Sequence, residues 1–210
     1  MSSSVLIRWS GLAAMLGGTL WTIAAVAHAS KPRGCIAAEC ASRPMRESGA
    51  FVGISTFLSV LLFAAGAVGL VTLVRSGGRF GRTGNAGVVI GAGGAAVLVI
   101  ATLVQAIFFG GDFPFMPHFV VPGLLALVVG FLLAGIAILR SGVLPRWVAV
   151  LVIVGALAML VANEQTARVL LMIPFGVAWV AVGYVLWSGA GAPTGRAAAL
   201  QGGLPCPRRP

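Results

Sequence analysis

The sequence predicts an all-α fold, a bundle of six transmembrane helices. The first observation behind this prediction is composition: 59% of the 210 residues are hydrophobic, only 9% are charged, and the mean hydropathy is +1.06. A soluble domain is about 25% charged, and a disordered chain is poor in apolar residues, so neither class fits. The second observation is that the apolar residues gather in six runs that contain no Lys, Arg, Asp or Glu.

Each run is long enough, or nearly so, to cross ~30 Å of hydrocarbon as a helix of ~20 residues. In lipid the backbone must satisfy its own hydrogen bonds, so uninterrupted apolar runs predict helices. A closed β-barrel would need ten-residue alternating segments, which are not seen. We expect one domain over 1–188, followed by a disordered basic tail over 189–210 that is rich in Gly, Ala and Pro. The predicted spans are 9–29, 50–74, 86–110, 119–139, 147–163 and 169–187.

The distribution of positive charge predicts the orientation. Nine of the fourteen Lys and Arg residues lie in the N-terminus, the second and fourth loops and the tail, and five lie in the other loops. Cytoplasmic loops carry the excess of Lys and Arg, so we expect a plasma-membrane protein with both termini in the cytoplasm. The first loop is the exception, with Lys31, Arg33, Arg43 and Arg46. The net charge of +10 is spread over loop ends, so the expected partner is the lipid bilayer and not nucleic acid.

The first run has a second interpretation, as a cleaved secretory signal. Arg8 precedes an apolar stretch that ends in Ala27-His28-Ala29, which fits an A-x-A cleavage site. The stretch from Trp9 to Val26 is longer than the usual ~7–15-residue signal core, which favours a retained helix.

The predicted cytoplasmic ends of the runs share a pattern. Arg75-Ser76-Gly77, Arg140-Ser141-Gly142 and Ser188-Gly189 close the even-numbered runs, where Ser-Gly is expected to stop the helix and start a turn. The pattern is expected for any pair of membrane helices with positively charged cytoplasmic ends. It is also compatible with three duplicated two-helix units.

A resemblance rests on the turn between the fourth and fifth runs. The segment Arg140-Ser141-Gly142-Val143-Leu144-Pro145-Arg146-Trp147, followed by a Gly-containing run and a Pro-containing last run, resembles a group of uncharacterised six-span bacterial membrane proteins. The resemblance covers roughly the last third of the chain. It implies a helical bundle in a bacterial plasma membrane and brings no catalytic residues. Members often carry an acidic residue in the last span, and this chain has none there.

Small residues predict the contact faces, because helices in lipid associate through close packing. We expect the helix faces that carry small residues in the first three spans to meet in the middle of the bundle. Gln105 follows Gly87 by five helical turns and is expected on the same, glycine-lined face of the third span. Pro174, six residues into the last run, is expected to kink that helix or free a carbonyl. The packing glycines are Gly11, Gly18, Gly87, Gly91 and Gly94, and Ser55 and Ser59 share a face with Gly66.

Several polar residues lie toward the predicted outer face. Of these, His28, Asp112 and His118 can bind a divalent metal or relay protons. The chain has no His-x-x-His, His-Glu-x-x-His or Glu-x-x-His spacing, so we expect no metal centre and no cofactor, and these three side chains are the candidate ligands if a site forms.

Cys35 and Cys40 lie in the first loop, on the side predicted to be oxidising, which favours a structural disulfide. Two free thiols and a redox-active pair are the alternatives, although a redox pair is more usually Cys-x-x-Cys. Cys206, in the opposite compartment, is expected to be free.

Three functions are compatible with these observations. No charge inside the spans marks an ion path, and no nucleophile–base pair marks catalysis, so we expect a non-enzymatic accessory, scaffold or partner-binding subunit that contacts another membrane protein or a second copy of itself. The first alternative is a transporter or substrate-binding membrane subunit for a small, largely apolar solute, with Gln105, Ser55, Ser59 and Pro174 lining the pocket. This alternative draws on a likeness in size and span count to the substrate-binding subunits of energy-coupling-factor vitamin transporters. The second alternative is a membrane thiol-redox protein that uses Cys35 and Cys40.

Overall fold

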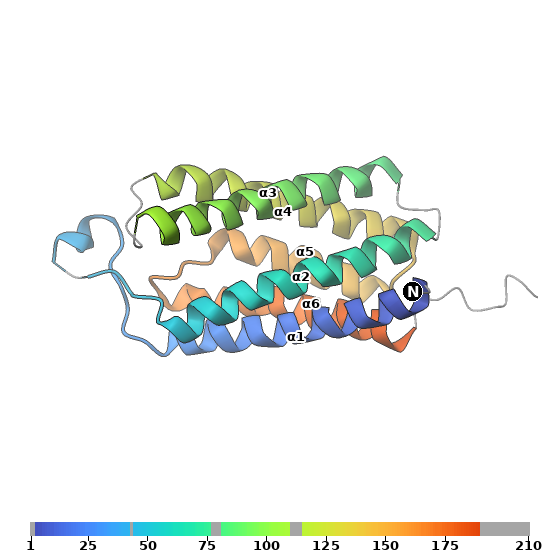
Figure 1. The fold of residues 1–210 in the computed structure, drawn as a ribbon, viewed down its shortest axis with the longest axis horizontal. Coiled ribbons are helices and arrows are strands. Elements are labelled where there is room, and N and C mark those ends of the chain that lie inside the picture. The colour runs from blue at the N-terminus through green and yellow to red at the C-terminus, as the bar shows by residue number, and fades with distance from the viewer. Residues whose placement is uncertain (1–2, 43, 77–80, 110–114, 190–210) are drawn as a thin grey trace, which may run out of the picture.

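The computed structural model describes residues 3–42, 44–76, 81–109 and 115–189 (Figure 1). Over these ranges the chain is helical and forms no strand. Two short 3-10 helices, η1 and η2, lie in the first and last connections, at Ala37–Ala41 and Ala167–Met172. The α-helices are α1 (Ser3–Ala29), α2 (Ala50–Ser76), α3 (Gly81–Phe108), α4 (Met116–Ser141), α5 (Arg146–Val161) and α6 (Ile173–Ser188). Of the predicted disordered tail, residues 190–210 lie outside the described residues.

Five segments are long and apolar enough to cross a membrane, namely α1 to α4 and the continuous η2–α6 segment. Helix α5 has 16 residues and is about 24 Å long at 1.5 Å per residue, short of the ~30 Å of hydrocarbon. It ends before the predicted limit of 163 because Ala162 turns to an extended conformation. By length alone, the six predicted spans therefore become five long segments and one short helix.

Ser-Gly stops are confirmed at two of the three expected places. Gly142 and Gly189 follow α4 and α6 in the left-handed conformation, with φ of 63° and 66°. The Gly142 N–H donates to the Ile138 carbonyl, and so does the Ser141 hydroxyl. Glycine adopts this conformation without strain, so the helix ends and the chain turns at once. Gly77, the third position, lies outside the described residues.

Pro174 does not kink a continuous α-helix as predicted. The chain from Ala167 to Met172 is a 3-10 helix, and α6 begins at Ile173 with Pro174 in its first turn. The backbone N–H that proline lacks would have no helical partner at that position, so the residue is accommodated at little cost.

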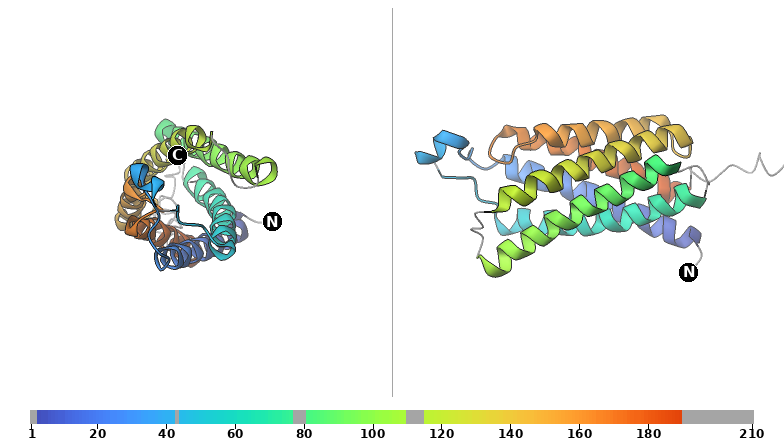
Figure 2. Two further views of the ribbon diagram at one scale, coloured as in Figure 1. Left: turned by 90° about the vertical axis from the view of Figure 1, so that its left-hand side faces the viewer. Right: turned by 90° about the horizontal axis from the view of Figure 1, so that it is seen from above.

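The helices pack in the order α2, α1, α6, α5, α4, α3 around a common centre (Figure 2). Among the described residues, α3 packs extensively only against α4. Only 17% of the most apolar stretch of α3 is buried inside the chain, against 56% for the η2–α6 segment. Most of the surface of α3 is therefore left to the surroundings.

The contact between α1 and α6 is built from four glycines, two on each helix and seven residues apart. Gly11 faces Gly183 and Gly18 faces Gly176, as antiparallel helices require. A Cβ atom added at Gly11 would lie 2.8 Å from the carbonyl oxygen of Gly183, and one added at Gly176 would lie 2.7 Å from that of Gly18. The two backbones therefore touch directly, which permits weak Cα–H···O contacts and close packing in lipid.

Helices α3 and α4 repeat this arrangement. Gly87 faces Gly130 and Gly94 faces Gly123, and added Cβ atoms at Gly87 and Gly94 would lie 2.8 and 2.6 Å from the facing carbonyl oxygens. Gly91 is half-buried against Gly130 at an ordinary contact distance. The glycine face of α3 is thus covered by α4.

We expected the faces lined by small residues in the first three spans to contact one another in the middle of the bundle, and this is only partly right. The faces of α1 and α2 do meet, because Gly66 packs against Ala14. The glycine face of α3 turns to α4 instead, since backbone contact needs glycines on both helices.

Aromatic rings fill the centre of the bundle. Phe63 from α2 stacks on Trp179 from α6, with ring centroids 4.9 Å apart, and Phe131 from α4 meets Phe175 from α6 at 5.1 Å. Trp21 of α1 completes the cluster, and its indole N–H donates to the Met172 carbonyl. The cluster ties α1, α2, α4 and α6 together where the glycine contacts do not reach.

Substituting Gly94 tests the backbone contact of the α3–α4 pair. We expect Gly94→Ala to lower the free energy of unfolding by about 1–3 kcal/mol, because the new methyl group must push α4 away. Gly93→Ala is the matched control, since no atom lies within 4 Å of a Cβ added there; its effect should be neutral, or stabilising by up to about 1 kcal/mol. Unfolding of the purified chain titrated with SDS measures both, and equal effects would contradict the described pairing.

Candidate functional site

The two ends of the bundle differ in charge. We call the end that bears Cys35 and Cys40 the disulfide end, and the opposite end the arginine end. All the glutamates, at positions 39, 47 and 164, lie at the disulfide end. The described cations of the arginine end are five arginines, at positions 8, 75, 82, 140 and 146. The site-forming polar groups are therefore concentrated at the disulfide end.

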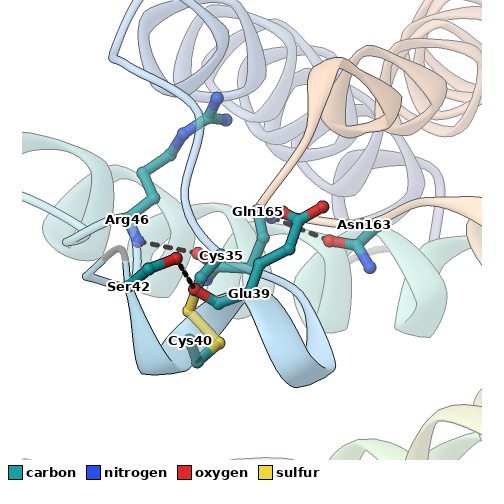
Figure 3. The surroundings of a disulfide bond; sticks show 7 residues. All are labelled: Cys35, Glu39, Cys40, Ser42, Arg46, Asn163 and Gln165. Atoms are coloured by element: carbon teal, nitrogen blue, oxygen red, sulfur yellow. Dashed lines mark hydrogen bonds between the residues drawn. A yellow bond between two sulfur atoms is a disulfide. The ribbon is translucent and has the colours of Figure 1, made fainter.

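The disulfide end is covered by a structure that we call the cap, which consists of loop 30–49 and connection 162–172. The loop projects beyond the ends of the helices (Figure 1). A disulfide joins Cys35 and Cys40 across the short helix η1, as predicted (Figure 3). Cys35 is buried and Cys40 is exposed. The disulfide therefore closes a small ring that is buried at Cys35 and exposed at Cys40.

Arg46 fastens the loop to the connection. Its side chain is buried, and Nε donates to the Pro32 carbonyl at 2.8 Å while Nη1 donates to the carbonyls of Glu164 at 2.9 Å and Thr166 at 3.4 Å. A buried charge is tolerated only when it is hydrogen-bonded, and here backbone carbonyl dipoles surround the guanidinium. The side chain thus joins the start of its own loop, 14 residues away, to a connection 118 residues away.

Gln165 also hydrogen-bonds the connection to the loop. Its Oε1 accepts the Arg46 backbone N–H at 2.7 Å (Figure 3), and its carbonyl accepts the Gly34 N–H at 2.9 Å. Its own N–H donates to Asn163 Oδ1 at 2.8 Å, which shapes the connection locally. A Cβ atom at Gly34 would collide with Gln165 Oε1 and the Arg46 backbone, so only glycine fits there.

His28 lies beneath the cap at the end of α1 with 3% of its surface exposed. Neither ring nitrogen is in hydrogen-bond geometry with a described group, although the Glu164 backbone lies beside the ring. The charged groups near it are Glu164, Arg46 and Lys31, all from the cap. Charged residues of the cap thus lie around this buried imidazole.

Of the three candidate metal ligands, the structure describes only His28 and His118. His118 is exposed at the start of α4, where its ring lies beside that of Phe115. Asp112 lies outside the described residues. Within the described ranges, no group of three or more His, Cys, Asp and Glu side chains can hold a metal ion.

The four candidate pocket residues lie on three different helices. Ser55 and Ser59 are buried on α2, and the Ser59 hydroxyl donates to the Ser55 carbonyl at 2.8 Å. Pro174 lies in the first turn of α6, and Gln105 lies on α3, which packs extensively only against α4. Two hollows in the described structure are lined by other residues. One, of about 310 Å³, lies in the cap between residues 31–33 and 44–47, and the other lies at the arginine end.

Sequence reasoning missed the roles of Arg46 and Gln165. Arg46 was counted only as a loop cation that opposes the predicted orientation, and Gln165 was not singled out. The signal available was the density of polar side chains at 163–166, directly after an apolar run. Such a segment offers hydrogen-bond partners to another loop, but it does not say which loop.

Comparison with protein-family models, with curated proteins and with solved structures finds no match to the chain. The fold itself defines the class: an all-helical polytopic bundle with five segments able to cross a membrane and a disulfide-bonded cap at one end.

Replacing Arg46 tests the cap. Arg46→Met should raise the hydrogen-exchange rates of the Gly34 and Arg46 amides by about 5- to 150-fold, because losing charge-assisted hydrogen bonds costs about 1–3 kcal/mol. Arg33→Met, at an exposed position of the same loop, is the control and should leave both amides protected. Unchanged protection in Arg46→Met would show that the guanidinium does not hold the cap.

Proposed function

We propose that the chain is a six-span plasma-membrane protein with both termini in the cytoplasm and the cap on the outer side. The orientation is supported by the distribution of Lys and Arg, with nine in the segments at the arginine end and five in those at the disulfide end. Helix α5 completes the sixth crossing together with its flanks. Arg146 and Trp147 lie at one end of α5, where they reach the interface, and polar residues follow Ala162 at the other.

Retention of the first helix follows from its packing. Helix α1 contacts both α2 and α6, and its glycines face glycines of α6. Removal of residues 1–29 as a signal would remove the glycine contact between α1 and α6. We therefore infer that α1 stays in the mature protein.

Within this topology the protein acts as a non-enzymatic accessory or partner-binding subunit, and the cap binds the partner. The observation that carries this proposal is that a projecting loop is fastened at Gly34 and Arg46 and closed by a disulfide, yet exposes apolar side chains. Met45 is 68% exposed and Ile36 is 43% exposed. A rigid loop loses little conformational entropy on binding, so such side chains can serve as anchors for a protein surface.

A cross-linking experiment tests both the orientation and the partner. Met45→Cys and, as control, Ser188→Cys are each placed in a Cys206→Ser background, and intact cells are treated with a membrane-impermeant, thiol-reactive bifunctional reagent. We expect position 45 to be labelled from outside and to yield one discrete protein adduct, whereas position 188 should react only after the membrane is permeabilised.

The result also separates the alternatives. An adduct with twice the mass of the chain would identify a second copy as the partner. Labelling at position 188 from outside, or no discrete adduct at position 45, would contradict the proposal. If the adduct persists in a Cys35→Ser/Cys40→Ser chain, the disulfide has no part in fixing the binding surface.

A further inference from the structure

A second hollow lies at the arginine end, remote from the cap. Its volume is about 260 Å³, and it lies between the beginning of α1 and the end of α6, where Val5, Arg8, Trp9 and Trp187 line it. Trp9 is 62% exposed and Trp187 is 42% exposed. The hollow is therefore open to the surroundings and is lined by one cationic side chain and two indole rings.

The glycine contact between α1 and α6 fixes the shape of this hollow. Gly11 touches the backbone of Gly183 and the N–H of Trp187, so the two helices cannot separate here without losing their packing. Arg8 lies almost one turn before Gly11, and its guanidinium carbon is 6.0 Å from the centre of the Trp187 ring. The ring orients the guanidinium by a cation–π contact and leaves its N–H donors available.

Within residues 3–42, 44–76, 81–109 and 115–189, no acidic side chain lies at the same end of the bundle as this guanidinium. Arg8 is exposed, and every glutamate that the structure describes lies at the opposite end of the bundle. The other described charges of the arginine end are also arginines, so the local field is positive. The described part of the chain therefore leaves the charge of Arg8 without an acidic partner.

We propose that this hollow binds the phosphate of a membrane phospholipid with a net negative headgroup. Tryptophan side chains favour the depth at which headgroups lie, and the arginine fork matches the geometry of a phosphate. Val5 and the faces of the two indole rings offer apolar surface to the glycerol and upper acyl carbons. A zwitterionic lipid presents the same phosphate with a cation beside it, which the neighbouring arginines disfavour.

Native mass spectrometry of the full chain in detergent, titrated with phosphatidylglycerol or phosphatidylcholine, tests the site. We expect one phosphatidylglycerol molecule to bind about five- to tenfold more tightly than phosphatidylcholine. Arg8→Gln should abolish this preference, and Trp187→Leu should reduce it. The matched control is Arg146→Gln, which removes the arginine of a second exposed Arg-Trp pair at the same end and should keep the preference.

Three outcomes would overturn the proposal. The first is equal binding of the two lipids by the unmodified chain. The second is an equal loss in Arg8→Gln and Arg146→Gln, which would show a diffuse effect of positive charge. The third is displacement of phosphatidylglycerol by millimolar inorganic phosphate, which would show that the hollow takes a free phosphate ion and not a lipid.

Discussion

Direct contact between helix backbones is the constraint on which the rest of the structure depends. Lipid tails are as apolar as leucine, so burying leucine against leucine gives helices in a membrane little reason to associate. Glycines on both helices let the α1–α6 and α3–α4 pairs approach until carbonyl oxygens lie against Cα atoms. The aromatic cluster around Trp179 then links α2 and α4 to the α1–α6 pair, and α5 closes the space between α4 and α6.

Both proposed binding surfaces derive from this packing. At the disulfide end, α1 and α6 hold loop 30–49 and connection 162–172 close enough for Arg46 and Gln165 to join them. At the arginine end, the same helix pair holds Arg8 beside Trp187. A tightly packed bundle thus presents a rigid polar cap on one side and a cationic, tryptophan-lined hollow on the other.

Features determined by neighbouring residues could be predicted from the sequence, whereas features determined by distant partners could not. The apolar runs indicated where the helices lie, and Ser141-Gly142 indicated a stop, because each depends on local backbone chemistry. The disulfide followed from two nearby cysteines. The partner of Gly87 depends on which helix offers a facing glycine, and the role of Arg46 depends on a connection over a hundred residues away. Pro174 was misassigned because an apolar run does not distinguish a 3-10 helix from an α-helix.

The most direct test of backbone contact is a double-mutant cycle on Gly11→Ala and Gly183→Ala, measured as free energies of unfolding. If the glycines touch, the first methyl group already separates the helices, so the pair should cost less than the sum of the single substitutions by at least about 0.5 kcal/mol. The combination of Gly11→Ala with Gly94→Ala, on the other helix pair, should be additive. Additive effects for Gly11 and Gly183, within about 0.3 kcal/mol, would contradict the account.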